Sequence, residues 1–325
     1  QGTILLSQPR YTSQLWDRFG HYVKDLPTSS PISFYKSTHD TRHFENITTA
    51  RDEAERKEMA KLPFMSLYAS MLYKMCMTCP DLAYGCAALG RTIMDPSLAG
   101  WYALLQMLAF THKHLDAGIT YGGDIRVPAF FQDAAEYRRM PTKWDELFIH
   151  NGGLYVLPDA SWKIEKTYAG FVIMMGNGAV DWATKLIRVI CHSSMEAEIA
   201  AGCFAAKRYM LVRQIINEIV GLRPVNTNPV APRMIKGPII FCIDNSATKH
   251  HTQDEGVKPK TEHFLRWQHY LRWIVMMGYG VVFWISTKNQ PVDFMTKVVD
   301  LTTFLKGRGL VMNIPHKHVL YITTV

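Results

Sequence analysis

Long apolar segments are absent from this sequence, and so are the marks of an exported protein. No apolar run approaches the roughly 18 residues that a membrane-spanning helix needs, so we expect no membrane partner. The N-terminus, Gln1-Gly2-Thr3, shows no basic segment leading into an apolar one and no signal-peptide cleavage pattern. We expect from this start that upstream sequence is missing or has been processed away.

Cysteine is scarce, with six residues in 325. Cys76 and Cys79 have the C-x-x-C spacing of a metal or redox site, but no second pair follows at the distance of a zinc ribbon. The reading we favour is that both pack in a helix core, because a free cysteine behaves as a small hydrophobe. The low cysteine use predicts an intracellular, reducing environment and does not distinguish cytoplasm, nucleus and organelle.

Acidic residues are fewer than basic ones, which gives a formal charge of +8 and a pI near 9.1. This balance favours a polyanionic partner such as nucleic acid, although a basic surface without any partner has the same composition. With 48% hydrophobic and 20% charged residues, the chain has enough apolar surface for a real core and is not disordered. Its length allows two domains.

The spacing of apolar residues changes along the chain. Residues 1–122 are mainly helical, with helices predicted over 11–23, from Ser66, from Pro80 and over 97–114. Residues 123–150 lack clean periodicity and are interpreted as a linker with a short helix. Residues 151–325 have an antiparallel opening, with strands predicted over 154–158, 168–175 and 180–190 and a hairpin turn at 176–178, and then alternate helices and strands. We therefore predict an α/β domain with a mixed sheet and flanking helices, preceded by a helical domain.

One stretch, 191–201, organises the second half of the chain. Ser193 is placed to cap a helix, and Glu196 three residues later can reach back, which is the capping-box pattern. Glu198 then lies one turn into an Ala-rich helix that we expect to continue to about Val220 and to stop at Gly221.

Three further acids follow strand-like runs. Asp159 follows the run 154–158, Asp244 follows 238–243, and Asp293 comes shortly after 281–285. Carboxylates at strand ends and on a neighbouring helix can converge on one point, and hard divalent cations need such oxygen clusters. The residues alone therefore suggest a metal site formed by Asp159, Glu198, Asp244 and Asp293.

The chain resembles the C-terminal part of the Pol polyprotein of copia-type LTR retrotransposons. The matching blocks occur in the family's order: 79–84 (T-R-P-D-I-A-Y), 158–162 (D-A-D-W), 169–172 (S-G-Y-V), 193–198 (S-S-T-E-A-E-Y), 244–247 (D-N-x-S-A), His263 with His269 (K-H-I-D-x-R-Y-H), and 292–297 (A-D-x-x-T-K). One block would be weak support, whereas several in the right order are specific.

The resemblance implies a reverse transcriptase thumb and connection region over residues 1–122, a linker over 123–150 and a ribonuclease H-like domain over 151–325. The four acids would be its catalytic and metal-binding residues, holding two Mg²⁺ ions for which Mn²⁺ can substitute. The expected activity is cleavage of the RNA strand of RNA/DNA hybrids. The family's Y-V-D-D polymerase motif is absent, and no Asp-Asp pair occurs in the chain, so it should not polymerise DNA by itself.

Basic residues near the matching blocks are candidates for contacts with nucleic acid: Lys163, Lys166, Lys185, Lys249 and His263. Taken alone, each lysine is better explained as an ordinary solvated side chain, and His263 is better explained by helix packing. The expected partners are an RNA/DNA hybrid or structured RNA, and a separate polymerase portion or a larger ribonucleoprotein assembly.

The chain departs from the family pattern at several positions. Ser161 replaces the second acid of D-A-D-W, Cys79 replaces an arginine, and Glu262 replaces the lysine before His263. These changes support a second hypothesis, a domesticated non-catalytic subunit that binds RNA or has a structural role. Survival of the four acids argues against it, because mutually repelling carboxylates have no structural use. A third reading, four unrelated surface acids, is also open.

Overall fold

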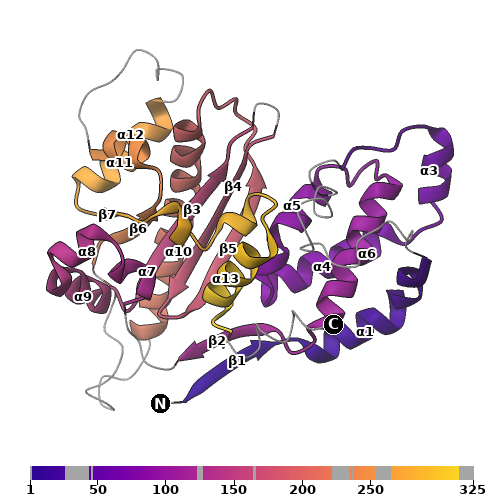
Figure 1. Cartoon of the computed structure of the whole chain (residues 1–325), viewed down its shortest axis with the longest axis horizontal. Coiled ribbons are helices and arrows are strands. Elements are labelled where there is room, and N and C mark those ends of the chain that lie inside the picture. The colour runs from indigo at the N-terminus through magenta and orange to yellow at the C-terminus, as the bar shows by residue number, and fades with distance from the viewer. Residues whose placement is uncertain are drawn as a thin grey trace. The chain divides into compact units, whose positions relative to one another are not determined.

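The computed structural model describes residues 2–25, 44, 47–122, 127–163, 166–221, 235, 237–253 and 265–314 (Figure 1). They form two compact units. The first contains Gly122–Val292, and the second contains Thr3–Tyr121 together with the described residues that follow Val292. None of the helices described is both long and apolar enough to cross a membrane.

A five-stranded sheet is the centre of the first unit, with strand order β5-β4-β3-β6-β7. The β3, β4 and β5 strands are antiparallel neighbours, and β6 and β7 run parallel to β3. This confirms the predicted mixed α/β sheet. The strands are β3 Leu154–Ser161, β4 Tyr168–Met175, β5 Gly178–Leu186, β6 Ile239–Ile243 and β7 Gly280–Trp284.

The β4–β5 connection is a tight turn, as the glycines around Asn177 predicted. Met175 and Gly178 are paired, so two residues make the turn, and Gly176 has φ +59°. Glycine adopts this left-handed conformation without the penalty that a Cβ atom brings. The β5 strand ends at Leu186, four residues before the predicted end.

Helices cover both faces of the sheet. On one face α10 (Ser194–Gly221) packs on β3 and β4, and α12 (Leu265–Met276) packs on α10. Gly202 allows the two helices to approach, since a Cβ atom there would meet Leu271 Cδ1 at 2.8 Å. On the other face, aromatic side chains of α7 (Ala129–Gln132) and α9 (Pro141–His150) pack on Tyr155 and Phe283.

Residues 127–150 are more ordered than the linker interpretation implies. They form α7, α8 (Ala135–Arg139) and α9, three helices where one was expected. Phe131 contacts Phe283 with ring centroids 4.5 Å apart, and Trp144 contacts the same ring at 4.7 Å. The described part of this segment therefore belongs to the core of the first unit.

The second unit is mainly helical, as predicted for the first third of the chain. It also holds a two-stranded sheet that was not predicted. Its elements are β1 Thr3–Ser7, α1 Pro9–Phe19, η1 Gly20–Asp25, α3 Glu53–Met59, α4 Phe64–Met77, η2 Pro80–Leu82, α5 Ala83–Gly90, α6 Leu98–Lys113, β2 Gly118–Gly122, η5 Asp293–Met295 and α13 Leu301–Met312.

Buried charged groups tie the second unit together. Arg308 of α13 donates to Asp81 of η2 over 2.8 Å, with both side chains almost fully buried. Lys74 of α4, 1% exposed, donates to Thr12 of α1 over 2.6 Å. The sequence assigned residues 293–314 to the predicted domain that covers 151–325. In the structure they are grouped instead with the N-terminal elements of the second unit. The functional domain boundaries at 122 and 150 stay a prediction.

All six cysteines are free thiols. Cys79 is buried as expected, but Cys76 is exposed on α4, so the helix-core interpretation is wrong for that residue. Among the described residues, neither joins a group of side chains that could hold a metal ion.

Candidate functional site

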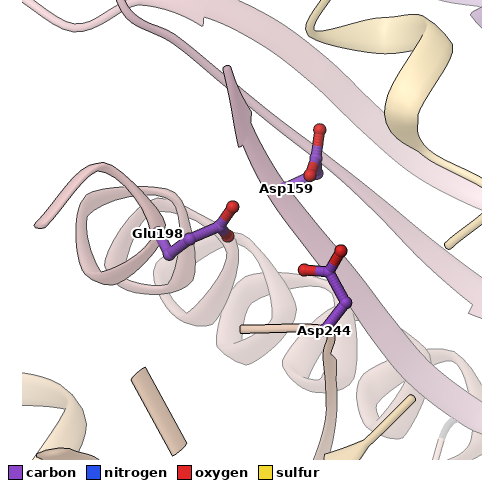
Figure 2. A group of neighbouring side chains, drawn as sticks. All are labelled: Asp159, Glu198 and Asp244. Atoms are coloured by element: carbon purple, nitrogen blue, oxygen red, sulfur yellow. The ribbon is translucent and has the colours of Figure 1, made fainter. Parts of the chain in front are cut away.

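Three of the four predicted acids meet in the first unit. Asp159 lies in β3, Glu198 in α10, and Asp244 directly after β6, and each offers a carboxylate oxygen within 4.8 Å of the others. Figure 2 shows the carboxylates of Glu198 and Asp244 directed toward the same space beside β3. Asp159 and Glu198 are only 2% and 7% exposed, whereas Asp244 is half-buried.

Strand register explains why Asp159 and Asp244 are neighbours. Val156 of β3 pairs with Phe241 of β6 in parallel orientation. Each acid lies three residues further along its own chain segment, so the two reach the same level of the sheet. Neighbouring strands are about 4.8 Å apart, which is the scale of the separation between the two carboxylates.

The start of α10 fixes the position of Glu198. Ser193 Oγ accepts from the Glu196 backbone over 3.3 Å, and Glu196 Oε2 accepts from the His192 N–H over 2.8 Å. This confirms the predicted cap, with His192 in place of Ser193 as the donor to Glu196. Glu198 Oε1 in turn accepts from the backbone N–H of Ala160 over 3.2 Å. Glu196 is therefore structural, and Glu198 points to the cluster.

Two tryptophans hold the segments that carry the acids. Trp162, just beyond β3, donates to the carbonyl of Cys191 over 2.7 Å and so connects the Asp159 strand to the loop before α10. Trp284 of β7 donates to the backbone carbonyl of Asp244 over 3.1 Å. Asn245 Oδ1 accepts from Thr248 N–H and caps α11 (Ser246–Gln253).

The three carboxylates are a suitable donor set for a hard divalent cation. Mg²⁺ binds oxygen at about 2.1 Å, so two oxygens on one ion can be at most about 4.2 Å apart. The ligand oxygens of the cluster lie within 4.8 Å of one another, so small side-chain rotations can bring them onto one ion, and the spacing also suits two ions about 4 Å apart. Without a cation, the three negative charges repel one another.

Asp293, the fourth predicted acid, is not one of the three side chains that form this group. It begins η5 in the second unit, and its carboxylate accepts from Lys297 Nζ over 2.8 Å. The segment before it belongs to the first unit, where Gln290 Nε2 donates to the carbonyl of Pro158 over 3.1 Å. Sequence reasoning did not identify Gln290, and only its place three residues before Asp293 could have drawn attention to it.

The predicted nucleic-acid contacts are in different environments. Lys163 is exposed, Lys166 is half-buried, and Lys185 lies on β5 over the Phe204 ring. Lys249 pairs with Glu136, and burial lowers the pKa of its ammonium group. His263 lies outside the described residues.

Comparison with known proteins finds Pol polyproteins of plant transposons. The chain is similar to the retrovirus-related Pol polyprotein from transposon TNT 1-94 of Nicotiana tabacum, 23% identical over 310 residues, which cover 95% of this chain and 20% of that protein. It is 22% identical over 303 residues to that from transposon RE1 of Arabidopsis thaliana, covering 88% of this chain and 18% of the relative. The chain thus spans about a fifth of the length of these relatives.

A shorter relative has a different name. Secreted RxLR effector protein 161 of Plasmopara viticola is 26% identical over 147 residues, which cover 44% of this chain and 86% of that protein. No protein-family model matches the chain. No solved structure matches it either.

Proposed function

Because the chain is homologous to a segment of retrovirus-related Pol polyproteins from plant transposons, we propose that its first unit is a ribonuclease H-like endonuclease. The proposed substrate is the RNA strand of an RNA/DNA hybrid, and the proposed reaction is two-metal phosphodiester hydrolysis. The observation that carries the proposal is the meeting of Asp159, Glu198 and Asp244 in one cluster.

These three acids would hold the cations. Asp159 would contribute an oxygen from β3, Asp244 one from the segment directly after β6, and Glu198 a carboxylate oxygen from α10. Two Mg²⁺ ions, when bound, supply the activated water and stabilise the departing 3′ oxygen. The rigid strands and the capped helix keep the carboxylates in place without substrate, which lowers the cost of assembling the site.

Asp293 is the fourth acid of the proposal. Its support is the resemblance of residues 292–297 to the family block.

A cleavage assay on a labelled RNA/DNA hybrid with and without Mg²⁺ tests the function. The full chain should cut the RNA strand only with Mg²⁺ or Mn²⁺, and Asp244→Asn should abolish the cut. Asp145→Asn, on α9 and outside the cluster, serves as the matched control and should retain the activity. Cleavage that persists in Asp244→Asn would remove the assignment.

The second candidate is a non-catalytic subunit that binds RNA within a larger assembly. It is favoured by Ser161, a buried serine two residues after Asp159 where the resembled block has an acid. In that case the chain would bind structured RNA or a hybrid without cutting it, with Mg²⁺ present, and Asp244→Asn would not alter binding.

A further inference from the structure

Two lysines of the first unit lie over aromatic rings on one side of α10. Lys185 Nζ of the edge strand β5 is 3.4 Å from the centroid of the Phe204 ring, and Lys207 Nζ is 5.6 Å from the centroid of the Tyr270 ring on α12. Lys207 follows Phe204 by three residues, so the two share one face of the helix. Cation–π contacts hold both ammonium groups in place while leaving their remaining N–H donors for another partner.

No acidic side chain in the described part of the chain neutralises the charge of these lysines. Neither forms an ion pair with a described residue, although Arg208 next to them makes a two-pronged pair with Asp181 over 2.9 Å. Burial, and then the charge of Lys207, lower the pKa of Lys185, so the two ammonium groups are close enough to repel each other. An anion between them would relieve that repulsion.

Lys207 and the Phe204 ring beneath Lys185 belong to α10, the helix that carries Glu198 of the carboxylate cluster. Phe204 follows Glu198 by six residues on α10, which is about 9 Å along the helix axis. Backbone phosphates advance about 3.4 Å per nucleotide along a duplex strand, so this distance corresponds to two or three nucleotides. Six residues also turn an α-helix by about 240°, so the lysines are displaced from Glu198 around the helix as well as along it, and a contact there would involve a phosphate other than the scissile one.

We propose that Lys185 and Lys207 form a binding site for one backbone phosphate of the nucleic acid substrate, set apart from the carboxylate cluster. This proposal rests on the proposed function for the identity of the ligand. Both lysines are exposed on an open surface, which suits a phosphate held in a polymer better than a free ion that needs enclosure. The contact would be independent of base sequence, as phosphate contacts are.

The test is the salt dependence of hybrid binding by the full chain in EDTA, where no cleavage occurs. Fluorescence anisotropy of a short labelled RNA/DNA hybrid would be measured for Lys185→Gln, Lys207→Gln and the double variant. Because the two lysines share one phosphate, each single variant should lose most of the effect. The double variant should lower the slope of log K against log salt by about 1.

Lys143→Gln is the matched control, since Lys143 is exposed on α9, which packs on the opposite face of the sheet. It should leave the slope unchanged, and circular dichroism should show every variant folded. The proposal would be overturned if Lys143→Gln lost as much affinity for the hybrid as the double variant. It would also be overturned if the losses of affinity in the two single variants added up to the loss in the double variant.

A competition arm separates the two sources of phosphate. Inorganic phosphate and sulfate would be added to the bound hybrid at the same concentration. If phosphate displaces the hybrid and sulfate does not, the lysine pair binds the free phosphate ion, and the assignment to a backbone phosphate is overturned. Because binding in EDTA does not depend on catalysis, a chain that binds through the lysines but never cleaves would refute the proposed nuclease and keep this site.

Discussion

Val156 and Phe241 are paired across the parallel β3 and β6 strands, and each lies three residues before an acid of the cluster. A shift of this pairing by one residue would move one carboxylate by about 3.3 Å and to the other face of its strand. The relative position of Asp159 and Asp244 in the candidate metal site is thus set by two apolar residues outside the group of acids.

Substitution by glutamine should lower the rate of hybrid cleavage at Glu198 and leave it unchanged at Glu196. Glu198→Gln keeps an acceptor for the Ala160 N–H but removes a metal-binding charge. The rate of hybrid cleavage should therefore fall by at least about 10²-fold, because substitution of residues that only support metal ligands already lowers activity by about 10- to 100-fold. Glu196→Gln still caps α10 and should cleave normally. Equal losses in both variants, measured as single-turnover rates, would contradict the assignment.

Glu196→Ala completes this comparison. It leaves the His192 N–H without its acceptor, so the free energy of unfolding should fall by about 1 kcal/mol. Urea denaturation measures the loss, and the cleavage rate should stay close to that of the unsubstituted chain.

Divalent cations should stabilise the protein through the cluster. Binding only to the folded state adds about 2.7 kcal/mol to the free energy of unfolding at a free ion concentration 100 times Kd. Thermal unfolding with Mg²⁺, Mn²⁺ or EDTA would reveal this as a higher Tm with metal. Asp244→Asn should lose the metal response and be at least as stable in EDTA, because it removes repulsion between carboxylates. A metal response that survives this substitution would place the ion elsewhere.

His114 should make the second unit sensitive to acid. Burial, followed by the charge of Arg308, lowers the pKa of its imidazole from 6.5 to about 4. Protonation therefore favours the unfolded state, so stability is full above pH 6.5 and declines as the pH falls from 6.5 to about 4. Between pH 7 and 5 this group should cost at most about 2 kcal/mol. Urea denaturation at pH 7 and at pH 5 measures this cost. In His114→Phe the free energy of unfolding should fall less between the two pH values, by the amount that His114 contributes.

The Asp81–Arg308 pair should be costly to break. Both side chains are almost fully buried, so Arg308→Met leaves an uncompensated carboxylate and should lower the free energy of unfolding by about 3–5 kcal/mol. The combined Asp81→Leu and Arg308→Met variant should regain part of that loss. Arg56→Met, which breaks the exposed pair with Asp95, is the control and should change little. A double variant less stable than Arg308→Met would contradict this account.

Local signals in the sequence were sufficient for several elements. The Ser193–Glu196 spacing predicted the start of α10, and the glycines around Asn177 predicted the hairpin, because caps and tight turns depend on a few adjacent residues. The meeting of Asp159, Glu198 and Asp244 was anticipated from strand ends and from the family resemblance.

Other features depend on contacts that periodicity does not reveal. The α7 to α9 helices are short, and their aromatic residues pack on the distant Phe283, so their order comes from tertiary contacts. The α11 and α13 helices were missed, although Asn245 and Asp300 are capping residues that could have indicated them. The grouping of α13 with η2 rests on the Asp81–Arg308 pair, which joins residues 227 positions apart.

The return of the chain to the second unit after Val292 affects how the protein can be dissected. A recombinant fragment covering 151–325 would carry α13 without η2 and α6, and would expose the apolar side chains of Phe304, Val311 and Met312 to water. A fragment ending at residue 121 would lose the arginine that neutralises Asp81. Both pieces should aggregate on expression, so intact chains with point substitutions are the better route to assigning function.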